Sequence, residues 1–251
     1  MLTYGASYLE RAAAILGEIR EKQGANIAKA ADVMAEAIAN GGLVHVFGSG
    51  HSVIPVLDIF PRYGSFPGFH PLLDPRLMWF NVLGPGGVRE LLWLERQEGY
   101  ISVFLRNFKL LGKDVLLVFS HGGLNAAPVE AALEAKRLGL TVVAVTSLEN
   151  HRRATATHSS GKKLADLADV VIDNCVPPED ALVEIDGLSE PVAAGSTVAV
   201  VAIAMALLSE VAGRLVKLNV TPKVFVSPNV AGVSPRHNEE VFEAYRELTD
   251  R

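Results

Sequence analysis

The chain has 251 residues, of which 49% are hydrophobic and 20% charged, and its formal net charge at pH 7 is −5. This length fits one large α/β domain or two small ones, and the apolar fraction supplies a sizeable core. The acidic balance without a Lys/Arg run argues against a dedicated nucleic-acid surface, and the single cysteine, Cys175, excludes a disulfide framework and a cysteine-rich metal site.

Helical patterns and short apolar strands alternate along the chain. Residues 4–23 and 27–38 carry apolar side chains at helical spacing, and Gly41 with Gly42 ends the second helix. In the first half, the later predicted elements are a strand at 43–47, a helix from about 52 to 58 or 60, an irregular segment at 61–85, a helical segment at 88–108 and a strand at 115–119. In the second half, they are a helix at 126–138, a strand at 141–145, a polar segment at 151–161 that is a loop or a frayed helix, strands at 170–173 and 182–185, a long helix at 196–218, an edge strand at 224–226 and a terminal helix at 235–249.

This alternation predicts an α/β fold, a three-layer α-β-α sandwich around a mostly parallel, five-stranded sheet of the flavodoxin-like or Rossmann-like type. No break in composition marks a second domain, so we expect one domain over residues 1–251, with a helical prelude at 1–41. The apolar run at 192–208 is shorter than the roughly 20 residues of a bilayer span, which favours a buried helix. The first residues do not resemble a signal peptide, and with the lone cysteine this favours the cytoplasm.

The first predicted strand ends in the loop Gly48-Ser49-Gly50-His51-Ser52. Its glycines match only the first two of a dinucleotide fingerprint, because Val53 stands in place of the third, so an NAD site is weakly supported. Backbone N–H groups, two hydroxyls and an imidazole suit a phosphate or a sugar hydroxyl. A tight turn without a ligand explains this loop, taken alone, equally well.

Two later strands also end in polar residues. Ser120-His121-Gly122-Gly123-Leu124-Asn125 follows the strand at 115–119, and Thr146-Ser147 follows the strand at 141–145. Gly122 and Gly123 allow the backbone to approach a ligand closely, whereas Asn125 either contacts the ligand or caps the next helix. Gly195-Ser196-Thr197 opens the long apolar helix with free N–H groups. Together these segments predict one ligand site at the carboxyl edge of the sheet.

The chain resembles the SIS family of sugar isomerase domains over nearly its whole length. The resemblance lies in Gly48 to Ser52, in Phe119 to Asn125, in the run Lys163 to Ile172 that leads into a strand, in Gly195-Ser196-Thr197, and in two segments shared with sugar-isomerase-domain proteins, Glu95 to Tyr100 and Val226 to Asn238. Such proteins resemble phosphoheptose isomerase and N-acetylmuramic acid 6-phosphate etherase in architecture. The family pattern has hydroxyl residues where this chain has Gly122 and Asn125, so the backbone amides of Gly122 and Gly123, with His121, are expected to substitute for them.

The resemblance implies a phosphosugar-binding protein, either an aldose–ketose isomerase or an amino-sugar-phosphate lyase. Both reactions require a base that removes a proton next to a carbonyl or an equivalent carbon, and neither requires a metal or a cofactor. Glu98, Glu95 and His237 are the catalytic candidates. A phosphosugar sensor without activity is the alternative, although the chain has no DNA-binding or kinase-like segment to serve as an output.

The expected substrate-binding residues are those of the strand ends and of the long helix's start: Gly48, Ser49, Gly50, His51, Ser52, Ser120, His121, Gly122, Gly123, Asn125, Thr146, Ser147, Ser196 and Thr197. The expected partner is a phosphorylated sugar or amino sugar, with no nucleic acid and no membrane. Alanine-rich N-terminal helices and the run Val198 to Leu208 present more apolar surface than one sheet layer covers, which favours a homodimer or homotetramer.

Overall fold

The protein, described by a computed structural model over residues 3–250, is built on a five-stranded, all-parallel sheet. The strand order is β2-β1-β3-β4-β5, and β1 lies between β2 and β3, with Val44 opposite both Phe69 of β2 and Val115 of β3. The predicted α/β fold class is confirmed. The strands are β1 (Val44–Gly48), β2 (Phe69–Pro71), β3 (Val115–Phe119), β4 (Thr141–Thr146) and β5 (Val170–Asp173).

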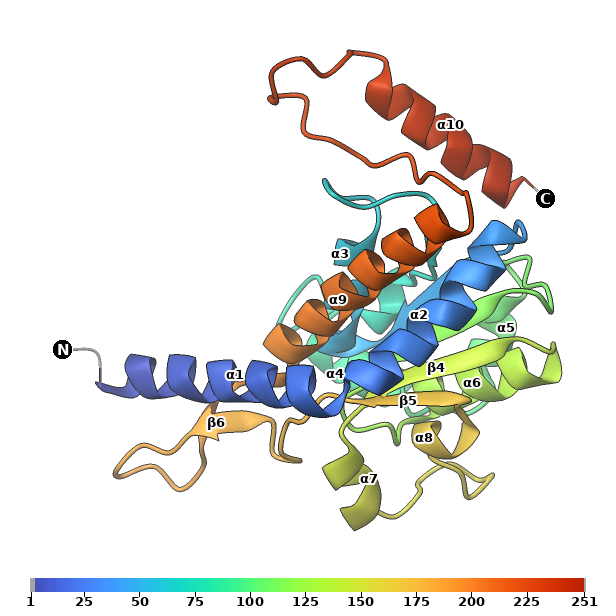
Figure 1. Cartoon of the computed structure of the whole chain (residues 1–251). Helices are drawn as coiled ribbons and strands as arrows, with labels where there is room; N and C mark the ends of the chain where they lie inside the picture. The colour runs from blue at the N-terminus through green and yellow to red at the C-terminus, as the bar shows by residue number, and fades with distance from the viewer. Residues whose placement is uncertain (1–2, 251) are drawn as a thin grey trace.

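Side chains alternate between the two faces of the sheet, and each face has its own apolar core. In β3, Val115, Leu117 and Phe119 join one cluster of buried side chains, whereas Leu116 and Val118 join the other. The first cluster lies under α2 (Gly24–Ala39), α3 (Val53–Ile59) and α9 (Ser196–Lys217), and the second under α4 (Val88–Leu94), α5 (Tyr100–Leu105), α6 (Ala126–Arg137) and α8 (Leu164–Leu167). Figure 1 shows α2 and α9 side by side on the same face.

Apart from β1, β3, β4 and β5, the observed strands differ from the predicted ones. The fifth strand of the sheet is β2, which comes from the segment expected to be irregular. The residues expected at 182–185 form β6 (Ala181–Val183), which pairs antiparallel with β7 (Val192–Ala194) apart from the sheet. Residues 224–226 form no strand, although Phe225 donates from its amide to Ser65 O over 2.7 Å. Three-residue segments depend on their neighbours for hydrogen bonds, so their own sequence predicts them poorly.

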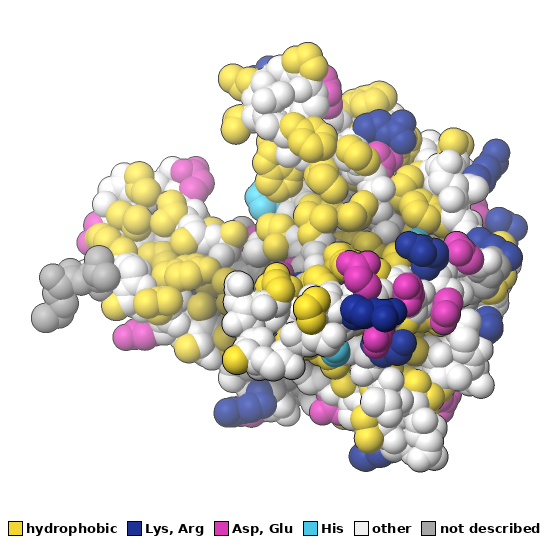
Figure 2. All heavy atoms as spheres, turned by 90° about the horizontal axis from the view of Figure 1, so that it is seen from above, with side chains coloured by type: hydrophobic (Ala, Val, Ile, Leu, Met, Phe, Trp, Pro, Cys, Tyr) yellow, Lys and Arg dark blue, Asp and Glu magenta, His cyan; other side chains and the backbone are white. Residues whose placement is uncertain are grey.

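The N-terminal helix α1 (Thr3–Lys22) projects from the body as an arm beside the β6–β7 hairpin (Figure 1). The Tyr8 hydroxyl donates to Ala194 O over 3.0 Å and fastens the hairpin to the arm. Leu9 is 67% exposed on this helix, and Figure 2 shows hydrophobic side chains gathered over the arm and across the facing part of the body. The arm therefore carries apolar surface that the rest of the described chain leaves uncovered.

The predicted terminal helix is α10 (His237–Thr249), which docks on the body through buried Val241 and through a 2.6 Å hydrogen bond between Tyr245 Oη and His70 Nδ1. Helix α9 is long and apolar enough to cross a membrane by length and composition alone. One side of it is buried in the first core cluster, against α2 and α3, as expected of a core helix. The short helix α7 (Leu148–Arg153) follows β4 directly.

Candidate functional site

A cavity of about 220 Å³ opens where the chain leaves β1 and β3. In a parallel sheet of this strand order, connections run in opposite directions from β1 and β3, which leaves a crevice beyond their carboxyl ends. The cavity is lined by Ser49, Gly50, His51, Ser52, Trp79, Val88, Leu91, Leu92, Glu95, Ser120, His121, Gly122 and Asn125. Eight of the predicted binding residues are therefore brought together with one predicted catalytic residue, Glu95.

The loop after β1 turns too sharply for a side chain at Gly48. A Cβ atom there would lie 2.2 Å from Ser52 O, so only glycine fits. Gly50, with φ +58°, begins a single turn of 3₁₀-helix over Gly50–Ser52. The Ser49 side chain does not cap this turn; it donates to Glu95 Oε2 over 2.9 Å. The loop thus presents its polar side chains to the cavity and to α4.

The loop after β3 has its carbonyl groups fixed from outside the cavity. The carbonyl oxygen of His121 accepts from the Ser147 amide over 3.0 Å and from Thr146 Oγ1 over 3.2 Å. The carbonyl oxygen of Gly122 accepts from Asn150 Nδ2 over 2.8 Å, and that of Gly123 from the Leu164 amide over 2.9 Å. The carbonyl oxygen of Leu124 accepts from Thr157 Oγ1 over 2.8 Å. Over residues 3–250, no acceptor is found for the amides of Gly122, Leu124 and Asn125. The loop therefore offers unpaired N–H groups at the start of α6.

Two residues of this loop explain its conformation. Gly123 has φ +63°, and a Cβ there would lie 2.8 Å from Thr146 Oγ1, so glycine is required on both counts. Its amide donates to Ser120 Oγ over 3.1 Å. Asn125 occupies the N-cap position of α6, but its side chain makes no capping hydrogen bond and lines the cavity. Of the two roles left open by the sequence, the structure places Asn125 at the cavity wall.

Glu95 lies at the C-terminal end of α4, beside the first turn of α6. Its carbonyl oxygen accepts from the Ala127 amide over 2.9 Å, which joins the two helix ends. The residue is only 7% exposed, and burial raises the pKa of its carboxyl group, opposed by the hydrogen bond from Ser49 and by Arg96 at 3.9 Å. A buried carboxyl with a raised pKa is the property expected of a general base that works near neutral pH.

The other two catalytic candidates lie elsewhere. Glu98 is exposed and accepts from both the amide (2.7 Å) and the hydroxyl of Ser159, and these hydrogen bonds lower the pKa of its carboxyl group. It lines a neighbouring cavity of about 250 Å³, which shares Asn125 with the first. His237, at the start of α10, has its Nε2 2.7 Å from Val224 O and does not line either cavity.

The remaining predicted binding residues support other segments. Thr146 contacts His121 O, and Ser147 caps α7 by accepting from the Asn150 amide over 3.2 Å. Ser196 donates from its amide and its hydroxyl to the Asp180 carboxylate, over 2.7 and 2.8 Å. The amino end of α9 is therefore already occupied by a carboxylate of this chain. Thr197 and Gly48 are likewise absent from the cavity wall.

Trp79 is a cavity residue that the sequence reasoning missed. Its ring centroid lies 4.4 Å from that of His51, and the two planes are tilted by 48°. Trp79 belongs to the irregular segment at 61–85, and a tryptophan in a long loop near two polar strand ends was the available signal. Aromatic faces pack against the C–H groups of ligands and fix their orientation.

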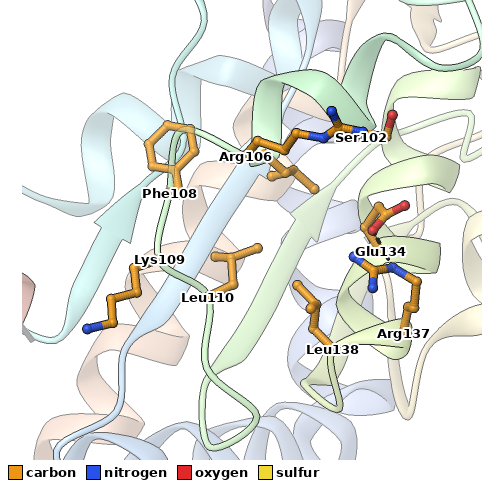
Figure 3. A pocket seen from close by; sticks show the side chains of 9 residues that line it. Ser102, Arg106, Phe108, Lys109, Leu110, Glu134, Arg137 and Leu138 are labelled. Atoms are coloured by element: carbon orange, nitrogen blue, oxygen red, sulfur yellow. Dashed lines mark hydrogen bonds and ion pairs between the residues drawn. The ribbon is translucent and has the colours of Figure 1, made fainter.

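A larger cavity, of about 560 Å³, lies away from these loops, between the ends of α5 and α6 and the segment before β3. Figure 3 shows Arg106, Phe108 and Leu110 on one side of it and Arg137, paired with Glu134 at 2.8 Å, on the other. None of the predicted site residues lines it. Within residues 3–250, no group of three or more His, Cys, Asp or Glu side chains is arranged to hold a metal ion.

The comparisons with known proteins agree with this architecture. A model of the SIS domain matches residues 7–147. A UPF0309 protein of Halalkalibacterium halodurans is 36% identical over 233 residues, covering 92% of this chain and 93% of that protein. A UPF0309 protein of Thermoanaerobacter pseudethanolicus is 35% identical over 243 residues, covering 95% of this chain and 96% of that protein.

Two solved structures share the fold. Phosphoheptose isomerase from Neisseria gonorrhoeae superposes with a TM-score of 0.56 at 17% identity, covering 82% of this chain and 96% of that one. A phosphoheptose isomerase from Francisella tularensis gives a TM-score of 0.51 at 19% identity, covering 84% and 98%. At these identities the superpositions establish the arrangement of strands and helices.

Proposed function

Because the chain belongs to the SIS domain family and is related over most of its length to the UPF0309 proteins, we propose that it binds a phosphorylated sugar in the cavity between the β1 and β3 loops and isomerises it. The observation that carries the proposal is the proximity of two features in that cavity: unpaired amides at the start of α6 and the buried carboxyl of Glu95. The sugar-phosphate isomerases among the solved structures of like fold support the same ligand class.

The phosphate group is assigned to the loop after β3. The amides of Gly122, Leu124 and Asn125 precede a helix of 12 residues, whose dipole adds positive potential at this end. The carbonyl groups of the loop are fixed by bonds to other segments, so they do not oppose an anion. The Ser120 hydroxyl, which accepts from Gly123, keeps its own proton to donate.

The reaction is assigned to Glu95. Its carboxylate takes a proton from the carbon next to the sugar carbonyl, and the electron pair of that C–H bond forms the double bond of an enediolate. Return of the proton to the neighbouring carbon, together with transfer of the hydroxyl proton from one oxygen of the enediolate to the other, exchanges aldose and ketose with no net loss of atoms or electrons. Burial, by raising the pKa of Glu95, strengthens it as a base at neutral pH. Elimination of a 3-substituent from an amino-sugar phosphate would use the same carboxylate.

A ligand screen followed by turnover tests the proposal. Thermal unfolding is measured with aldose, ketose and amino-sugar phosphates, each against its unphosphorylated parent, because a bound ligand raises the unfolding temperature by mass action. The stabilising compounds are then incubated with the protein and followed by ¹H NMR in D₂O, where isomerisation exchanges the transferred proton. Stabilisation only by unphosphorylated sugars or by nucleotides would overturn the phosphosugar assignment.

Two variants separate the catalytic candidates and the sensor alternative. Glu95→Gln keeps an oxygen that accepts from Ser49 but removes the base, and we expect turnover to fall by about 10²-fold or more while binding persists. Glu98→Gln tests the other carboxylate, in the neighbouring cavity. Binding without turnover of any phosphosugar by the parent protein would favour a sensor.

The proposal includes a homo-oligomer located in the cytoplasm. The exposed apolar residues of α1, among them Leu9 at 67% and Leu16 at 36%, support association, because an arm of this kind buries its apolar side only against another chain. The single, free cysteine is in keeping with a reducing compartment.

A further inference from the structure

His121 is held in place through its backbone and through its ring. Its backbone carbonyl accepts from the Ser147 amide over 3.0 Å and from Thr146 Oγ1 over 3.2 Å. Its ring nitrogen Nδ1 lies 3.0 Å from the side-chain nitrogen Nδ2 of Asn174. The other ring nitrogen, Nε2, is buried and has no hydrogen-bond partner in the described chain, although His121 lines the ligand cavity.

Asn174 itself has only one orientation that satisfies its neighbours. The residue is completely buried, and its backbone amide donates to Thr146 O over 3.0 Å at the end of β4. Its side-chain oxygen Oδ1 accepts from the Val176 amide over 3.0 Å, so the amide cannot be flipped without placing two donors against each other. The NH₂ group must therefore face His121.

This arrangement determines which nitrogen of His121 carries the proton. Since Nδ2 of Asn174 only donates, Nδ1 of His121 must accept, and a neutral imidazole then has its hydrogen on Nε2. A buried N–H without an acceptor is rare in folded proteins and indicates a missing partner. We infer that Asn174 is a positioning residue, which keeps hydrogen on Nε2 of His121 as a donor for an oxygen atom of the ligand.

The inference deepens the proposed function and rests on it for the identity of the ligand. His121 lines the same cavity as Glu95 and Gly122, so an Nε2–H group there suits a carbonyl, hydroxyl or phosphate oxygen of the phosphosugar and disfavours an ammonium group. The signal from the sequence was small, because Asn174 is 53 residues from His121 and looks like an ordinary polar residue after a strand.

The tautomer is measured without any ligand. In protein labelled with ¹⁵N at histidine, long-range ¹H–¹⁵N correlation spectra distinguish a protonated nitrogen from an unprotonated one, and the His121→Gln variant assigns the signals. We expect the neutral ring of His121 to show hydrogen on Nε2 and none on Nδ1. Hydrogen on Nδ1 in the parent protein would overturn the inference, whatever the protein binds.

Substitution of the positioning residue completes the test. Asn174→Asp keeps the Oδ1 acceptor for Val176 but replaces the donor with a second acceptor, so the hydrogen of His121 moves to Nδ1. At a pH where the ring is neutral, affinity for the phosphosugar found by the screen is expected to fall about tenfold. Unchanged affinity together with a changed tautomer would overturn the inference.

A double-mutant cycle separates positioning from a merely structural effect. Glutamine at position 121 carries an NH₂ group that donates regardless of residue 174, so Asn174→Asp should cost less affinity in the His121→Gln background than in the parent. The added negative charge acts in both backgrounds alike and cancels; equal costs would therefore overturn the inference. If Asn174→Asp does not fold, the parent spectrum alone decides. If no phosphosugar binds, the proposed function fails while the tautomer is still determined.

Discussion

Ser49 Oγ donates a hydrogen bond to Glu95 Oε2 over 2.9 Å, which joins the loop after β1 to the end of α4. The two residues are 46 positions apart in the sequence. The bond favours the ionised form of Glu95, whereas burial favours the protonated form and is the larger effect, so the pKa of the carboxyl is raised above its ordinary value of 4.5.

This pKa predicts how stability depends on pH. Between 4.5 and the raised value, folded Glu95 binds more protons than unfolded Glu95, so its ionisation lowers the free energy of unfolding as the pH rises. The Glu95→Gln variant lacks this cost. We expect its stability, relative to the parent, to increase as the pH rises through that window, as measured by urea unfolding from pH 4 to pH 8. Ser49→Ala should move the upper end of this window to higher pH, because the hydrogen bond that lowers the pKa is lost. A stability of Glu95→Gln that falls relative to the parent as the pH rises would contradict the assignment.

A methyl group at position 123 is expected to damage the loop after β3. The left-handed backbone of Gly123 costs an alanine about 1–2 kcal/mol, and its Cβ would also press on Thr146 Oγ1 at 2.8 Å. Gly161, with φ +68° and open space around it, is the matched control because Gly161→Ala meets only the backbone cost. Chemical unfolding should show a larger loss of stability for Gly123→Ala than for Gly161→Ala. Equal losses of stability would show that the contact of the new Cβ with Thr146 has no effect.

Asn150 holds the loop from α7, since its Nδ2 donates to Gly122 O over 2.8 Å. Asn150→Ala should cost about 1 kcal/mol of stability and weaken phosphosugar binding, because a released carbonyl can turn toward the anion. Asn107→Ala removes a similar bond, Nδ2 to Phe104 O at 2.9 Å, away from the cavity. Isothermal titration should find weaker phosphosugar binding only in Asn150→Ala. A similar loss of affinity in both variants would show that the bond from Asn150 to Gly122 O has no special effect on binding.

Cys175 is expected to be unreactive in the folded protein. Burial, together with the negative charge of Asp173, raises the pKa of its thiol to about 12. At pH 8 the reactive thiolate is then about one part in ten thousand, and alkylation by iodoacetamide should be at least about a hundredfold slower than in urea. Mass spectrometry of the timed reaction gives both rates. Rapid alkylation under native conditions would show that the thiol is accessible and its pKa low.

The α1 arm is expected to mediate self-association. Leu9→Lys places a charge on its exposed apolar side and should reduce the mass measured by light scattering after gel filtration. Glu10→Lys is the control, because it introduces the same lysine at the neighbouring exposed position. An unchanged mass in Leu9→Lys, or a monomeric parent protein, would contradict the proposed oligomer.

The sequence predicted the fold class because the long strands are local patterns. The apolar runs in β1, β3, β4 and β5 each alternate with a helical segment, and that order requires a parallel sheet with helices on both faces. The strand β2 was missed because Phe69–Pro71 has only three residues and forms by pairing with β1. Its apolar pattern is too short to be read locally.

The different surroundings of Glu95 and Glu98 come from the tertiary structure. They are three positions apart, and a continuous helix would place them on neighbouring faces. The chain instead leaves α4 at Glu95, and Gly99, with φ +89°, starts α5 in a new direction. Glu95 is consequently buried beside Ser49, while Glu98 turns toward Ser159.

The sequence by itself determined that polar loops follow the buried strands and that these loops meet at one edge of the sheet, because both follow from local periodicity and parallel topology. Only the tertiary structure decided which hydroxyls and amides remain unpaired there. Ser196 is bound by Asp180, Ser147 caps α7, and the amides of Gly122 and Leu124 have no acceptor in the described chain. Partners of this kind come from distant segments, and hydrogen-bond satisfaction is a property of the packed chain rather than of any one motif.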